Sequence, residues 1–205
     1  MPKVSPEHLH ARRNQILDAA TLCFARNGVR ETTVSRICQQ AGLSTGGVYR
    51  YFKSKGDILD AVYARARASN TRFGAAISSA PDPLEALIGM VGAMVGFVDD
   101  PALRVEHHLS MQVHAASLSD PALARSYSRT HQEVVEQLTP ILRDLQEQGR
   151  VRAEVDVPYA VWLILCTYQG LRVQRMLDGT LDMERLAASF QDMVRRTLVA
   201  GPASP

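Results

Sequence analysis

The sequence predicts an all-α protein of about nine helices, and three observations support this prediction. Apolar residues recur at the three- and four-residue spacing of amphipathic helices, with no convincing strand and no internal repeat. Asp-Pro pairs and single glycines punctuate these runs at the positions where helices begin and end. Residues 32–52 have the pattern of a helix, a tight turn and a second short helix. Together these features favour a three-helix head followed by a larger helical body.

Local signals place the helices of the head. A first helix is expected from Ser5-Pro6-Glu7 to Gly28, a second from a cap at Thr32 or Thr33 to Gly42, and a third after a cap at Ser44 or Thr45. The run Ser54-Lys55-Gly56-Asp57 has a capping-box pattern, with Asp in place of the usual Glu, and begins a fourth helix that continues to about Ala76.

The body begins after the boundary Ala80-Pro81-Asp82-Pro83. Aspartates at the starts and glycines at the ends set the expected limits of its helices. These limits are residues 84–98, 102–117, about 122–148, 157–177 and 183–199.

The composition is that of a soluble globular protein. Its 205 residues are 46% hydrophobic and 21% charged. The nearest candidate for a membrane span, residues 84–98, is too short and contains Glu85. No signal-peptide pattern opens the chain, and three cysteines without close spacing indicate a reducing cytosol. We therefore expect a cytoplasmic protein without membrane association.

Charge is unevenly distributed although the net charge is only +2. Residues 1–67 hold 11 Lys and Arg against 5 Asp and Glu, whereas residues 68–205 hold 12 against 16. A basic head on an acidic body is typical of a nucleic-acid-binding domain joined to a domain of another function.

The second short helix of the turn motif presents a surface suited to DNA. Val48 and Phe52 anchor it, and a helix with small, hydrogen-bonding and cationic outward groups fits a major groove. Tyr49 fits equally a position at the edge of the core. Arg12 and Arg13 can reach phosphates from the start of the first helix. The outward residues are Thr45, Gly46, Gly47, Tyr49, Arg50 and Tyr51.

This stretch and its flanks resemble the DNA-binding domain of the TetR family of transcriptional regulators. The most specific match is the run Y-x-Y-F-x-S-K from Tyr49 to Lys55, and the resemblance covers about the first third of the chain. We expect a DNA-binding domain over residues 1–53, a connecting helix over 54–80, a ligand-binding and dimerisation domain over 81–200 and a disordered tail over 201–205. The matching residues are Ile16 to Ala20, Phe24-Ala25, Gly28, Thr32 to Val34, Ile37, Ala41 to Ser44, Gly46, Val48-Tyr49, Tyr51-Phe52 and Ser54-Lys55.

The resemblance also implies which residues contact DNA. Thr33 and Ser44 match positions whose hydroxyls contact phosphate, and Lys55 matches a phosphate contact after the groove helix. Many members have lysine where this chain has Thr45, so a cation is lost there. Arg50 can supply one in its place, in a bidentate contact with guanine. The candidate DNA-contacting residues are Thr33, Arg36, Ser44, Thr45, Gly46, Gly47, Tyr49, Arg50, Tyr51 and Lys55.

Polar and polarisable side chains are scattered through the apolar helices of residues 80–180, as in pockets for largely apolar small molecules. Gly89, Gly92 and Gly96 indicate either close helix contact or space for a ligand. The same side chains also fit a plain core. The candidate ligand-binding residues are Met90, Met94, His107, Met111, Gln112, Tyr127, His131, Trp162, Cys166, Tyr168 and Gln169.

Other classes of function receive little support. His107, Met111 and His114 share a helix face and with Glu106 or His131 offer a weak metal or haem alternative, but no tight ligand motif accompanies them. We expect no metal and no cofactor. Neither a Walker loop, a dinucleotide fingerprint, H-E-x-x-H nor G-x-S-x-G is present, so we do not expect an enzyme.

The predicted eighth helix, residues 157–177, has almost no polar face, and such a helix must be buried on all sides. A two-fold dimer formed by the last two helices would bury it, as the resemblance also implies, whereas a monomer with a large helical core is the alternative. The candidate dimerisation residues are Val161, Leu165, Leu186, Phe190, Met193 and Val194.

These observations favour a ligand-responsive transcriptional regulator, a repressor by family resemblance, that binds a palindromic operator as a homodimer and is released by a small, largely apolar effector. Such a protein would associate with the bacterial nucleoid when bound to double-stranded DNA. One alternative is a DNA-binding regulator without an effector. A less favoured alternative is a helical protein whose function does not involve DNA.

Overall fold

The computed structural model describes the backbone of residues 6–200 and the side chains of residues 7–65 and 74–200. Within this described part of the chain, nine α-helices and one short 3-10 helix form the regular structure, with an isolated β-bridge between Val151 and Val199. The all-α prediction is confirmed. The expected cap at Ser5 and the expected disordered tail lie outside the described residues.

The chain forms two compact units that do not follow the expected domain limits. Unit 1 comprises Met1–Ala68 with Val105–Tyr127, and unit 2 comprises Ser69–Arg104 with Ser128–Pro205. The head therefore includes a segment that is distant in sequence, which helical periodicity alone does not indicate.

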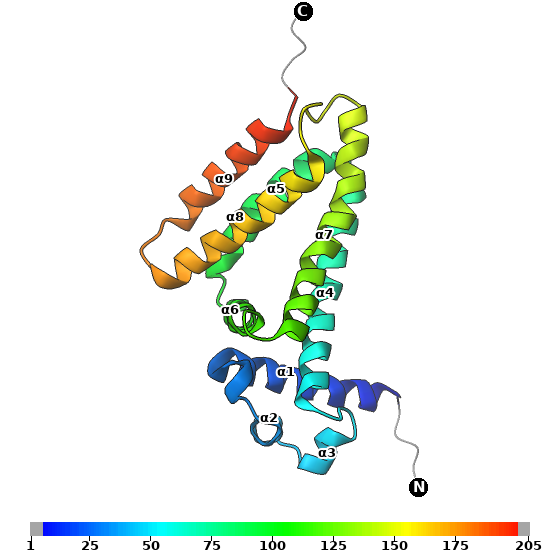
Figure 1. The fold of residues 1–205 in the computed structure, drawn as a ribbon, viewed down its shortest axis with the longest axis vertical. Coiled ribbons are helices and arrows are strands. Elements are labelled where there is room, and N and C mark those ends of the chain that lie inside the picture. The colour runs from blue at the N-terminus through cyan, green and yellow to red at the C-terminus, as the bar shows by residue number, and fades with distance from the viewer. Residues whose placement is uncertain (1–5, 201–205) are drawn as a thin grey trace, which may run out of the picture. The chain divides into compact units, whose positions relative to one another are not determined.

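Unit 1 contains α1 (Pro6–Glu31), α2 (Val34–Ala41), α3 (Thr45–Tyr49), the start of α4 (Lys55–Ser78), almost all of α6 (Arg104–Ser117) and the start of α7 (Pro121–Glu147). Figure 1 shows α2 and α3 following α1 in blue and cyan. One core joins these helices, because the fully buried side chains of α1, α2, α3, α4 and α6 belong to a single cluster. Its most deeply buried members include Ile16, Phe24, Ile37, Val48, Ile58 and Val113.

A sharp kink interrupts α1 at Gly28, where the sequence predicts the end of the helix. Gly28 has φ 80° and ψ 164°, a conformation essentially restricted to glycine, and a further turn continues to Glu31. Thr32, which is completely buried, closes the kink, because its hydroxyl lies 2.7 Å from the Gly28 carbonyl oxygen and 3.1 Å from that of Cys23. The kink therefore redirects the chain just before α2 begins.

The helix caps of the turn motif follow the sequence closely. The Thr33 hydroxyl accepts a hydrogen bond from the Arg36 N–H, and Ser44 caps α3. Gly42 ends α2 with φ 64° and ψ 33°, the left-handed conformation expected of a C-terminal glycine. Ser54 and Asp57 form the predicted capping pair, with the Asp57 N–H 3.1 Å from the Ser54 Oγ.

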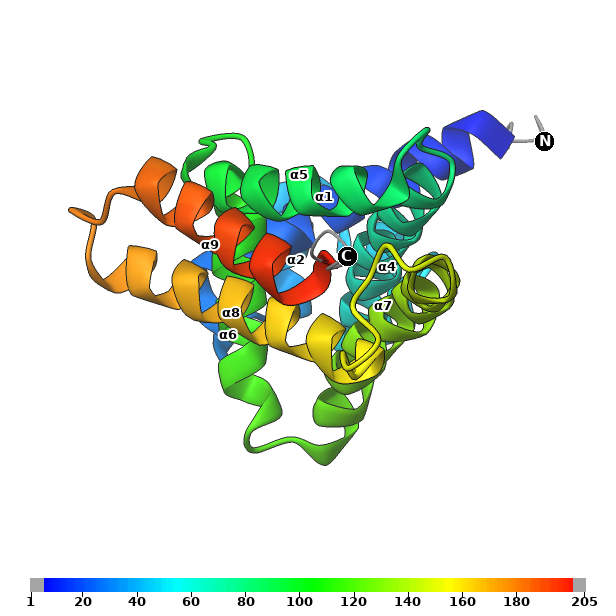
Figure 2. The same ribbon diagram turned by 90° about the horizontal axis from the view of Figure 1, so that it is seen from above.

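Unit 2 is built on α5 (Pro83–Gly96), α8 (Val157–Leu177) and α9 (Met183–Leu198), with η1 (Phe97–Asp99) and the remaining parts of α4 and α7. α5, α8 and α9 lie side by side in Figures 1 and 2. A Cβ atom at Gly92 would collide with the Gln191 side chain, which donates a hydrogen bond to the Ile88 carbonyl oxygen at 3.1 Å. Of the two explanations for the α5 glycines, close helix contact therefore holds at Gly92.

A single chain does not cover α8 on all sides, so its expected burial by a second copy stays a prediction. Tyr159 is 69% exposed and Leu163 is 64% exposed, and Cys166 is also exposed. These residues lie on one face of α8, whereas the opposite face, including Val161 and Leu165, is buried in the core of unit 2. An apolar row thus remains at the surface of the chain.

The candidate dimerisation residues lie mostly in this core rather than on that surface. Only Met193 among them is well exposed, at 46%. Leu186 is partly buried against the core. The residues buried inside unit 2 are Val161, Leu165, Phe190 and Val194.

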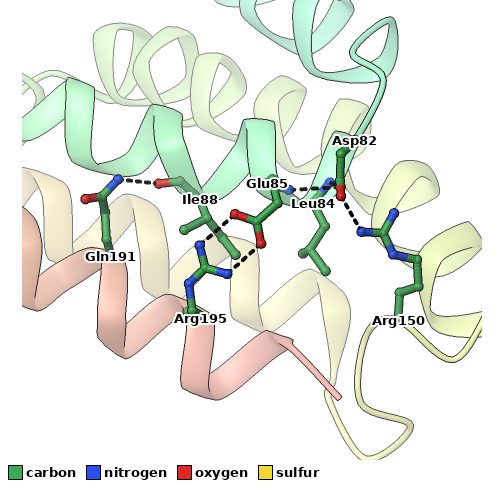
Figure 3. A network of polar contacts seen from close by, with 7 residues as sticks. All are labelled: Asp82, Leu84, Glu85, Ile88, Arg150, Gln191 and Arg195. Atoms are coloured by element: carbon green, nitrogen blue, oxygen red, sulfur yellow. Dashed lines mark hydrogen bonds and ion pairs between the residues drawn. The ribbon is translucent and has the colours of Figure 1, made fainter. Parts of the chain in front are cut away.

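A polar network ties α5 to α9 and to the segment after α7 (Figure 3). Glu85 accepts two hydrogen bonds from the Arg195 guanidinium, at 2.5 and 2.6 Å. Asp82 caps α5 and also accepts a bond from Arg150 at 2.6 Å. In each case the arginine is the principal cause that holds the pKa of the carboxyl below its ordinary value.

We expect this network to weaken in acid. A carboxyl whose pKa is lowered by folding stabilises the protein above its ordinary pKa, and this contribution disappears as the pH falls below about 5 towards the lowered pKa. Glu85→Gln should therefore reduce the dependence of the melting temperature on pH in acid, measured by circular dichroism. The exposed Glu147 at the end of α7 gives the control Glu147→Gln. An equal effect of both substitutions would contradict the assignment.

No single helix in residues 6–200 is long and apolar enough to span a membrane.

Candidate nucleic-acid interface and effector site

The groove-facing surface predicted for α3 is exposed in unit 1. Val48 is completely buried and Phe52 nearly so, and these two residues hold the short helix against the core. Tyr49 is 50% exposed, which places it on the surface rather than in the core. The remaining outward residues Thr45, Gly46 and Arg50 are exposed and Gly47 is half-buried.

The two capping hydroxyls lie at the starts of α2 and α3. Thr33 Oγ1 is 3.2 Å from the Arg36 N–H nitrogen, and Ser44 Oγ is 3.2 Å from that of Gly47. Both residues are exposed, and a hydroxyl that accepts from the backbone can still donate its own proton. The arrangement fits phosphate contact at helix starts, where N–H groups and the helix dipole favour an anion.

A basic pocket adjoins the end of α3. It is open, has a volume of about 330 Å³, and is lined by Leu9, His10, Arg13, Arg50 and Tyr51. The Arg13 guanidinium carbon lies 5.3 Å from the centre of the Phe52 ring, so a cation–π contact holds this side chain beside α3. The sequence indicated Arg13, but it gave no signal for His10.

Arg12 and Lys55 each donate hydrogen bonds within unit 1. Arg12 Nη1 donates to the Gln15 side chain at 2.8 Å. The Lys55 ammonium donates to the carbonyl oxygens of Val29 and Arg30, at 2.9 and 3.1 Å. It thereby satisfies carbonyls after the α1 kink, so a phosphate contact of Lys55 must share the ammonium with the fold.

Three of the candidate ligand-binding residues, His131, Trp162 and Gln169, come together between α7 and α8 in unit 2. His131 Nε2 is 3.0 Å from Gln169 Nε2, and the His131 ring is stacked with Trp162 at a centroid distance of 6.4 Å. The candidate Tyr168, also on α8, contacts Arg172 instead, and burial raises the pKa of its hydroxyl. Trp162 is the only tryptophan of the chain.

Other candidates are placed elsewhere. His107, Met111, Gln112 and Tyr127 belong to unit 1. Gln112 approaches the α1 kink, since its Oε1 would be 3.0 Å from a Cβ at Gly28, and the Tyr127 hydroxyl is 3.1 Å from His114 Nδ1.

The last three candidates, in unit 2, are not part of the α7–α8 cluster. Met90 packs against the core, Met94 is half-buried on α5, and Cys166 lies on the outer face of α8. No group of three His, Cys, Asp or Glu suited to a metal ion occurs among the described residues.

Arg172 is the residue of this region that the sequence gave no reason to select. It follows Tyr168 by one helical turn, is only 8% exposed, and its guanidinium carbon lies 5.4 Å from the Tyr168 ring centre. Its Nε and Nη2 atoms are buried and have no hydrogen-bond partner. An arginine in a helix is ordinarily expected to be solvated, and only the packing shows that Arg172 is buried.

Two family matches cover the head and the body of the chain separately. The family described as "Bacterial regulatory proteins, tetR family" matches residues 16–62, and the one described as "BetI-type transcriptional repressor, C-terminal" matches residues 83–199. A protein of Mycobacterium tuberculosis named HTH-type transcriptional repressor Rv1474c is 32% identical over 203 residues, covering 96% of this chain and 100% of the relative.

Solved structures have the same fold. The complex of triclosan with SmeT, the repressor of an efflux pump of Stenotrophomonas maltophilia, has a TM-score of 0.81 and 25% identity, covering 95% of this chain and 96% of that one. The regulator FadR of Bacillus subtilis, in complex with stearoyl-CoA, has a TM-score of 0.72 and 25% identity, covering 90% and 98%. The matches extend over the head and the body alike, and the chain belongs to the TetR family of bacterial transcriptional regulators, which are not enzymes.

Proposed function

We propose that this protein is a cytoplasmic, ligand-responsive transcriptional repressor that binds a palindromic operator as a homodimer. The observation that carries the proposal is the exposed surface of α3, flanked by two capped helix starts and by the basic pocket. A helix of this kind enters the major groove while neighbouring groups hold the phosphates on either side. Two heads would occupy successive major grooves of the operator.

Phosphate contacts and base contacts are assigned to different residues of the interface. Arg13 and Arg50 line one open pocket together with His10 and Tyr51, which suits a phosphate oxygen better than a base edge. Tyr49, half exposed on α3, is then the principal side chain available to read bases. This replaces the guanine contact that the sequence suggested for Arg50.

The dimer surface is the apolar row of α8. Tyr159, Leu163 and Cys166 recur at helical spacing, and a Cβ added at the next position of the row, Gly170, would meet no atom within 4 Å. Leu177 continues the row and is 77% exposed. A row of exposed apolar residues that includes a glycine permits close approach of a second helix, so we assign it to the second copy.

An effector bound in the body would favour a head spacing that does not fit the operator. A hundredfold loss of operator affinity corresponds to about 2.7 kcal/mol, and operator DNA must weaken effector binding by the same factor. The relatives that were solved with stearoyl-CoA and with triclosan support a largely apolar effector for this chain.

Binding of the purified protein to the DNA upstream of its own gene tests the proposal. Fluorescence anisotropy at two salt concentrations should show tight, sequence-preferring binding that weakens with salt. Weak binding that is equal for all duplexes would contradict the assigned interface. Operator binding that no small molecule relieves would instead favour a regulator without an effector.

Arg50→Ala should weaken binding to operator and to unrelated duplex alike, and should lower the salt slope of log affinity by about one, because one phosphate contact is lost. Arg143→Ala, at an exposed arginine of α7 in unit 2, is the matched control. Anisotropy titrations over a salt series measure both quantities. If Arg50→Ala relaxes sequence preference at constant salt slope, Arg50 contacts a base instead.

A further inference from the structure

Arg172 stands out as a buried charge that the protein itself leaves incompletely satisfied. Its side chain is 8% exposed, and Nε and Nη2 have no hydrogen-bond partner. None of the ion pairs found among the described residues includes Arg172. Its neighbour Arg175, less than one turn later, is instead paired with Asp99 at 2.7 Å.

A buried guanidinium without an anion is unfavourable, because it gives up its hydration and gains no partner. The Tyr168 ring lies 5.4 Å from the guanidinium carbon and its hydroxyl interacts with the Arg172 side chain, but Nε and Nη2 remain without a hydrogen-bond partner. An arginine cannot relieve the strain by losing its proton in the physiological range. The unpaired atoms thus require an acceptor that comes from outside the protein.

The side of α8 that carries Arg172 also carries groups that suit an amphipathic acid. Trp162, Leu165 and Gln169 lie on the same side of α8 as Arg172 by helical spacing, and His131 of α7 contacts both Trp162 and Gln169. Aromatic and aliphatic groups beside a few polar ones form the usual lining for a mostly apolar ligand. Arginine adds a planar fork that matches two oxygens of one oxyanion.

We propose that the effector is an apolar molecule with a carboxylate or equivalent oxyanion, and that this anionic group binds Arg172. The inference rests on the proposed ligand-responsive function and specifies the chemical class of its ligand. Uncharged and cationic molecules of the same shape leave the guanidinium unsatisfied and are rejected by this site.

Decanoate and decanol provide a matched pair of probes, and Trp162 fluorescence reports binding at the cluster because no other tryptophan contributes. Wild-type protein should bind decanoate about ten- to a hundredfold more tightly than decanol. Arg172→Met should abolish this preference. Arg175→Met, which alters a paired arginine of the same helix, should retain it.

The stability of the ligand-free variants provides an independent measurement. Arg172→Met removes an unpaired charge while retaining an apolar side chain of similar length, so its melting temperature should equal or exceed that of the wild type. Arg175→Met removes a charge that has a partner, so its melting temperature should not rise. A clear fall in the melting temperature of Arg172→Met would overturn the inference, because it would mean that the folded protein already satisfies the guanidinium.

The inference is also overturned if decanoate does not bind, if decanol binds as tightly, or if Arg172→Met keeps the preference for the acid. Operator binding is measured in parallel on the same proteins. Duplex binding that an uncharged molecule relieves, with no effect of decanoate, refutes the anionic effector alone. Absence of any operator preference refutes the proposed function itself.

Discussion

Replacing Leu163 with Glu is expected to separate the two copies of the chain and to weaken operator binding by about 10²–10⁴-fold, the gain that linking two binding modules provides. Leu163 is 64% exposed at the centre of the apolar row of α8, so a glutamate there should change the stability of the isolated chain little. In the dimer, two carboxylates would be brought together and removed from water.

Sedimentation analysis should show a monomer for Leu163→Glu under conditions in which the wild type is a dimer, with unchanged helical content by circular dichroism. Leu118→Glu is the matched control, because Leu118 is 83% exposed and lies outside the row. A dimer that persists in Leu163→Glu would refute the assignment of the α8 row, and a wild type that is monomeric would refute the dimer.

Gly28→Ala is expected to destabilise unit 1 by about 1–3 kcal/mol through its backbone alone, because φ 80° with ψ 164° is a conformation that residues with a Cβ rarely adopt. The new methyl group would also lie 3.0 Å from the Gln112 Oε1 of α6. Urea denaturation followed by circular dichroism gives the free energy of unfolding, and operator affinity should fall with it because α2 and α3 follow the kink.

A double-mutant cycle separates the two causes. Gln112→Ala in the Gly28→Ala background should recover only the part of the loss that arises from crowding. Full recovery would show that the backbone conformation is not strained, whereas no recovery would show that Gln112 moves aside without cost.

The helices themselves could largely be predicted from the sequence, because their ends depend on local chemistry. Asp156 caps α8 and Asp182 caps α9 as the sequence indicates, and Gly42 adopts the predicted left-handed conformation. The start of α6 was predicted two residues too early, since Asp100 caps the Ala102 N–H within a turn that precedes the helix.

Tertiary packing could not be predicted in the same way. A continuous apolar run does not reveal which of its faces a single chain can cover, so the sequence led to Val161 as a dimerisation residue although Val161 is buried and Leu163 is exposed. The burial of Arg172 likewise depends on neighbours distant in sequence. The ammonium of Lys55 is engaged by carbonyls 25 and 26 residues earlier, which no local pattern specifies.

Unit 1 is built from two separate segments of the chain, which limits how its head can be transplanted. Val113 of α6 is completely buried and Leu123 of α7 nearly so, and both belong to the core that supports α3. A gene fragment that ends with α4 would encode a head whose core lacks these side chains. We therefore expect that a chimera carrying the operator specificity of this chain needs residues 105–127 together with the head in order to fold stably.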